Sequence, residues 1–81
     1  MNNLKVPTCD LKVVVYCKDN HKLIGQVNIA GYERFSDYYK KVDVLNMYNV
    51  KGIQDGYKNF MHSYVAVERC NIILAIPLKE E

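Results

Sequence analysis

The sequence predicts a mainly β protein: a small, strongly bent antiparallel barrel of five strands, with one short helix between strands two and three. Apolar and polar residues alternate with a period of two in five segments, and sustained helical periodicity is nearly absent. The chain has 81 residues, which is the size of one domain with a thin core. We therefore expect a single barrel domain over residues 1–81, with tails at 1–10 and 78–81.

The first two strands are predicted to form a hairpin. Residues 11–17 alternate between an apolar face and a wetter face, and the returning segment 22–30 does the same. The Asp-Asn-His sequence at 19–21 supplies the turn, because Asp and Asn side chains bond their own backbone and tolerate left-handed conformations. Gly25 stands where a packed side chain is expected, so we predict a sharp bend there.

The short helix is expected over residues 36–41. Ser36 is a competent N-cap, and Asp37 lies in the first turn, where the helix dipole favours an anion. Lys40 and Lys41 lie in the last turn, where the dipole favours cations. These signals predict a helix of one or two turns.

Three further strands complete the predicted sheet. Alternation resumes over residues 43–51, and a loop containing two glycines is expected over 52–59. The last two strands are predicted over 60–67 and 72–76, with Pro77 ending the pairing. Five short, bent strands in a chain of this size are typical of small barrels of the SH3, Sm or OB kind.

Charge and hydropathy exclude several classes of protein. Eleven Lys and Arg against nine Asp and Glu give a net charge of +2, well below the basic balance of proteins whose nucleic-acid affinity rests on phosphate neutralisation. No secretory signal is visible, and the longest apolar run is far shorter than the ~20 residues of a membrane span. We expect a cytoplasmic protein with no membrane partner.

The chemically reactive residues do not form a recognisable catalytic or metal-binding pattern. The three cysteines are odd in number and widely spaced, which fits neither a disulfide framework nor the paired arms of a zinc site. Cys17, His21 and His62 leave a metal site assembled in space as the alternative to ordinary reduced thiols. No spacing places a nucleophile beside a base. We expect a protein that is not an enzyme and carries no metal or cofactor.

The aromatic residues indicate a contact surface. Seven tyrosines and two phenylalanines occur without a tryptophan, and tyrosine suits half-buried surfaces. Aromatic residues with Arg and few carboxylates are typical of an interface core. A capped barrel end, a protein interface and a base-stacking surface stay open as uses for one cluster, which comprises Tyr32, Arg34, Phe35, Tyr38 and Tyr39.

Two segments resemble the motifs of Sm and LSm proteins. Residues 67–76 resemble the second Sm motif, in which an Arg-Gly-Asn turn joins two hydrophobic strands, with Cys70 in place of the glycine. Residues 13–27 resemble the opening of the first Sm motif, including its bending glycine at Gly25. The closing Asp and Met-Asn pair of that motif is matched only loosely, by residues 43–47. The whole chain also resembles a group of small uncharacterised bacterial proteins with an Arg-Phe/Leu-Ser-Asp-Tyr/Leu segment.

The Sm resemblance implies a ring of barrels that binds RNA. In such a ring Asn46, Arg69 and Asn71 would face the pore and contact bases. The residues alone also allow a second interpretation, in which the segment at 69–71 is a plain polar turn.

We therefore expect a non-enzymatic interaction or assembly module built on an Sm-like barrel. It forms homo-oligomers or docks on a protein partner through strand edges and exposed tyrosines. An RNA-binding Sm-like ring protein is the alternative. Net charge favours the module, and the turn at 69–71 favours the RNA-binding ring.

Overall fold

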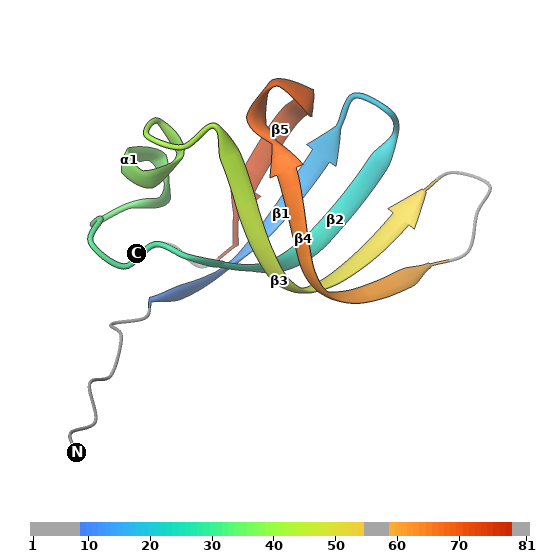
Figure 1. The fold of residues 1–81 in the computed structure, drawn as a ribbon, viewed down its shortest axis with the longest axis horizontal. Coiled ribbons are helices and arrows are strands. Elements are labelled where there is room, and N and C mark those ends of the chain that lie inside the picture. Colours follow the sequence, from blue (N-terminus) through green and yellow to red (C-terminus); the bar gives the residue numbers. More distant parts are fainter. Residues whose placement is uncertain (1–8, 55–58, 79–81) are drawn as a thin grey trace, which may run out of the picture.

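The protein folds as one five-stranded antiparallel sheet with a short helix, shown in Figure 1. The computed structural model describes residues 9–54 and 59–78. The strand order is β4-β3-β2-β1-β5. Along the chain the elements are β1 (Asp10–Cys17), β2 (His21–Asn28), α1 (Phe35–Tyr39), β3 (Val44–Gln54), β4 (Phe60–Glu68), the 3₁₀ turn η1 (Arg69–Asn71) and β5 (Ile72–Pro77).

The predicted fold class is confirmed in its coarse form. Five antiparallel strands are present, and the helix lies between β2 and β3. The closed barrel is not confirmed, because β4 and β5 end the sheet on opposite sides and do not pair with each other. The sheet is bent so that β4 crosses in front of β1 and β2, while η1 connects it back to β5 (Figure 1). Neither helix in the described part of the chain is long and apolar enough to cross a membrane.

The sheet contains a bulge where β2 meets β3. Ile24 lies opposite Lys51 and Gln26 opposite Tyr48, so two steps along β2 match three along β3. Asn49 absorbs the additional residue with a left-handed φ of 52°, a conformation that Asn tolerates well. A Cβ on Gly25 would lie 2.9 Å from Val50 Cγ2, so the glycine permits the close approach of the two strands.

One face of the sheet and the buried side of α1 form the core. Alternate residues of β1 and β2 are buried, as the period-two pattern predicts. Phe35 and Tyr38 bring α1 onto the same cluster. The core consists of Leu11, Val13, Val15, Cys17, Leu23, Val27, Ile29, Phe35, Tyr38, Leu45, Met47, Val50, Val67 and Ile72.

The start of the helix differs from the prediction. Helix α1 begins at Phe35, and its N-cap is Arg34, whose side chain makes no capping hydrogen bond. Ser36 is inside the helix and is not the N-cap, while Lys40 is the C-cap. Burial of the Phe35 ring in the core decides where this helix begins, and that tertiary contact outweighs the local capping signal.

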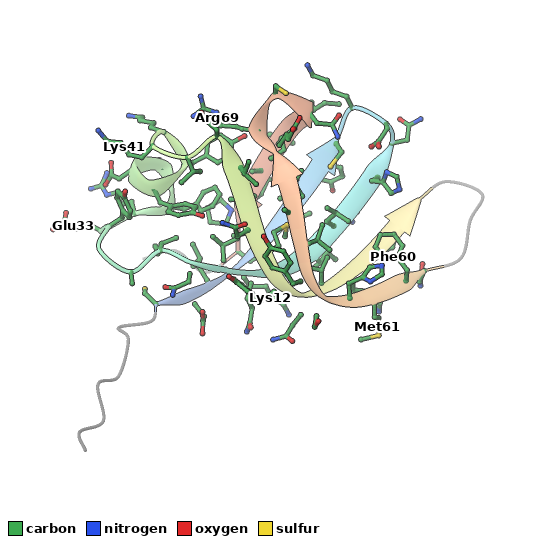
Figure 2. The ribbon with its side chains drawn as sticks, in the orientation of Figure 1. Lys12, Glu33, Lys41, Phe60, Met61 and Arg69 are labelled. Atoms are coloured by element: carbon green, nitrogen blue, oxygen red, sulfur yellow. The ribbon has the colours of Figure 1, made fainter. Side chains whose placement is uncertain are left out.

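The loop predicted over residues 52–59 differs at its start, while residues 55–58 of that prediction lie outside the described residues. Strand β3 continues through Gly52 to Gln54, and Gly52 lies opposite Phe60 on β4. The Phe60 ring occupies the space that a Cβ on Gly52 would need. Phe60 and the next residue, Met61, point to opposite sides of β4 (Figure 2). Gly52 is thus a strand residue covered by a cross-strand aromatic ring, a pairing known to compensate for glycine in sheets.

We predict that Gly52→Ala lowers the free energy of unfolding by about 1–3 kcal/mol, because the new methyl group displaces the Phe60 ring. The cost should largely disappear when Gly52→Ala is made in a Phe60→Ala background. Urea denaturation of the wild type, both single variants and the double variant measures this coupling. An equal cost in both backgrounds would contradict the proposed contact.

Candidate interaction surfaces

The outer edge of β4 presents unpaired backbone groups. Arg69 N–H donates to Asp43 O at 2.8 Å, and Val44 lies opposite Glu68. In an antiparallel ladder this pattern marks Val44 and Glu68 as a non-hydrogen-bonded pair, whose backbone groups point away from the partner strand. Alternate residues of β4 share that orientation. The groups without a partner among the described residues therefore belong to Tyr64, Ala66 and Glu68.

The edge of β5 is shorter. Leu78 N–H donates to Lys12 O at 2.9 Å, and Val13 lies opposite Pro77. By the same ladder geometry, Pro77 and Ala75 direct their backbone groups away from β1. Proline has no N–H to offer, which is why it is tolerated at this position. Ala75 supplies both a donor and an acceptor at this edge, and Pro77 only an acceptor.

A groove of about 700 Å³ runs beside the edge of β4. Its floor is apolar and its rim is polar. Four consecutive residues of β4 line it, so a strand added to this edge would place alternate side chains in the groove. The lining residues are Cys17, Asp19, His21, Leu23, Phe60, Val65, Ala66, Val67, Glu68, Cys70 and Asn71.

The polar groups of the groove interact with one another. His21 Nδ1 and Asp19 Oδ1 are 2.9 Å apart, and this hydrogen bond lowers the pKa of Asp19. Burial, with the nearby charge of Asp19, raises the pKa of the Cys17 thiol. The His21 ring meets the Phe60 ring edge-on, with centroids 6.1 Å apart. A neutral thiol and a paired carboxylate suit binding better than nucleophilic chemistry.

The three residues predicted to contact RNA are not joined to one another by any hydrogen bond among the described residues. Arg69 is the first residue of η1, and its side chain lies between η1 and α1 (Figure 2). Its Nη1 donates to Tyr39 O at 2.9 Å, and its guanidinium carbon lies 5.7 Å from the centroid of the Tyr39 ring. Asn46 Oδ1 accepts from Tyr64 Oη at 2.6 Å. Asn71 lines the groove, and its carbonyl accepts from Lys18 N–H at 2.8 Å.

The predicted aromatic cluster is largely used in packing α1 onto the sheet. Phe35 and Tyr38 are buried, and burial raises the pKa of both Tyr38 and Tyr39. The Phe35 and Tyr39 rings have centroids 5.5 Å apart, and those of Tyr32 and Tyr38 are 5.6 Å apart. Tyr32 is 38% exposed and Arg34 is exposed, so these two residues remain accessible to a partner.

Sequence reasoning missed the exposed apolar residues of the strands. The signal was present, because apolar residues occupy both faces of several strands where one polar face is usual. Among the described residues no group of three His, Cys, Asp or Glu side chains is arranged to hold a metal ion. The exposed large apolar residues on strands are Val44, Tyr48, Met61, Tyr64, Ile73, Leu74 and Ile76.

We predict that Arg69→Ala lowers the free energy of unfolding by about 1–3 kcal/mol, because Tyr39 O then loses a hydrogen bond from a charged donor. Arg69→Lys should cost less, since it keeps a cationic donor but loses the contact of the guanidinium with the Tyr39 ring. Urea denaturation measures both changes. An unchanged stability for Arg69→Ala would show that this contact does not hold α1 in place.

We predict that Cys9 and Cys70 react quickly with a thiol reagent at pH 8, whereas Cys17 reacts only on unfolding, because it is buried and the first two are exposed. The pKa of the Cys17 thiol is raised in the folded protein. The thiol therefore contributes fully to stability below its ordinary pKa of ~8.5, and this contribution is lost as the pH rises through the raised pKa. Timed modification with mass mapping measures the rates. Equal rates for all three thiols would contradict the burial of Cys17.

Comparison with known proteins assigns no family: neither the protein-family models nor the curated proteins gave a match to this chain.

Proposed function

We propose that the protein is a non-enzymatic assembly module whose copies join by strand pairing, with the β4 edge of one copy against the β5 edge of the next. The observation that carries this proposal is the pair of unpaired edges at the two ends of one bent sheet. Tyr64, Ala66 and Glu68 offer backbone groups at one edge, and Ala75 and Pro77 at the other. Strand addition at such edges is a common mode of protein recognition.

The two edges favour a repeating contact over a symmetric pair. Each copy has one long edge at β4 and one short edge at β5, so joining unlike edges leaves the same two edges free on the complex. A contact of this kind produces a ring when its rotation closes and a filament when it does not. The strong bend of the sheet supports ring closure and the finer proposal of an Sm-like barrel.

Apolar burial supports the same contact. Ile73 on β5 is 66% exposed. A thin core gains proportionally more from covering such residues than a large domain does. The groove beside β4 provides Val65 and Val67 as an apolar floor for the incoming strand.

RNA binding, the alternative that the Sm resemblance implies, has less support. Its motivation is the turn at residues 69–71. The Arg69 guanidinium and the Asn46 side chain already make contacts within the chain, so an RNA base would have to compete with Tyr39 and Tyr64.

We predict that Ala66→Pro weakens self-association at least roughly tenfold, a loss of about 1.4 kcal/mol, while the protein stays folded. Proline at position 66 removes an outward N–H and leaves the ladder to β3 intact. Ala66→Thr is the matched control, since it keeps the N–H. Val65→Pro should unfold the protein, because the N–H of Val65, which this substitution removes, points toward β3.

Analytical ultracentrifugation across a wide concentration range measures association, and circular dichroism reports the fold. Ala75→Pro at the β5 edge provides a second test if Ala66→Pro is unstable. A wild-type mass of 9.4 kDa at every concentration would overturn the proposal. So would a folded Ala66→Pro variant that associates as the wild type does.

A further inference from the structure

The face of the sheet opposite the core has an unusual composition. The register across β5, β1, β2 and β3 defines two rows of neighbours on this face. A third row crosses β1 and β2 and meets the exposed Tyr48 of β3 at the border of this face. We call these ten residues the outer patch: Leu74, Tyr16, Lys22 and Ile53 in the first row, Ile76, Val14, Ile24 and Lys51 in the second, and Lys12 and Gln26 in the third.

Six of the ten positions of the outer patch are apolar or aromatic. The solvent-facing side of an antiparallel sheet is normally polar. Val14 is only 8% exposed although it points away from the core, because its neighbours Ile24 and Ile76 surround it. The patch thus forms a small apolar surface that a binding partner would cover.

The charge of the outer patch is of one sign. Its charged residues are Lys12, Lys22 and Lys51, and it contains no carboxylate. On the described residues of β1, the carboxylate with the same orientation is Asp10, which lies opposite Asn28 at the start of the strand. Three cations around an apolar centre complement a partner that combines carboxylates with apolar side chains.

We propose that the outer patch binds an acidic segment of another protein, in which carboxylates alternate with aliphatic residues. The aliphatic side chains contact Ile24, Leu74 and Ile76, and the carboxylates reach the three lysines. This site is independent of the strand edges used in self-association. A single copy of the protein presents it whole.

Three other occupants fit the outer patch less well. Single-stranded RNA would need bases stacked on accessible aromatic rings. The Tyr16 ring in the patch lies 5.5 Å from Lys22 Nζ. The Tyr48 ring, at the border opposite Gln26, packs on the Tyr64 ring with centroids 5.4 Å apart. Stable attachment to an anionic membrane usually requires more basic residues or a second anchor. Two outer patches face to face would bring lysines together, which disfavours a second copy.

The probe is a fluorescent ten-residue peptide of alternating Glu and Val, compared with one of alternating Lys and Val. Fluorescence anisotropy at 150 mM salt should show binding of the Glu-Val peptide alone. Binding should weaken as salt rises, because exposed charges are screened. Lys12→Gln with Lys51→Gln should weaken the affinity about tenfold, given the modest strength of each exposed ion pair. Leu74→Ser should weaken it as well.

The matched control is Lys40→Gln with Lys41→Gln, which removes the same charge outside the outer patch and should leave affinity within about twofold. Equal losses in the two double variants would overturn the proposal, since binding would then follow net charge alone. Failure of the Glu-Val peptide to bind would also overturn it, as would tighter binding of polyuridine or of phosphatidylglycerol vesicles. Ala66→Pro should bind the peptide normally, so this test is separate from the test of self-association.

Discussion

The bulge between β2 and β3 is the constraint on which the rest of the molecule depends. Gly25 lets the two strands approach each other, and Asn49 takes up the additional residue in a left-handed conformation. The bend brings β4 across the sheet and leaves the groove between its edge and the β1–β2 hairpin. Without the bend, the same five strands would form a flat sheet, with neither a groove nor an open end for α1 to cover.

Incomplete closure gives the protein its surfaces. A closed barrel has no free edges, whereas this sheet ends in two. Unprotected edges tend to aggregate, and Pro77 limits the β5 edge by removing one donor. The long edge at β4 and the short edge at β5 favour pairing of unlike edges, which ends at a fixed number of copies when the copies close into a ring. The outer patch adds a surface whose lysines oppose contact with a second copy of itself.

The sequence predicts the strands well because burial on one face of a sheet imposes a period of two. It fails where a tertiary contact decides the outcome. Burial of Phe35 moves the helix start away from Ser36, and the Phe60 ring allows Gly52 to remain in a strand. The outer patch was not predicted either. Its ten residues come from four strands, and only the register shows that three lysines and six apolar residues share one face.

The position of Arg69 separates a structural role from a recognition role. The Sm resemblance implies that Arg69 contacts an RNA base in a ring. In the structure its guanidinium donates to the last carbonyl of α1 and lies over the Tyr39 ring. The helix lies between β2 and β3, at the place where the resemblance to the first Sm motif breaks down. An Arg in the turn after β4 is well placed to hold such an inserted helix against the sheet. An arginine at this turn is therefore explained by its contact with α1, and no RNA contact is needed to account for it.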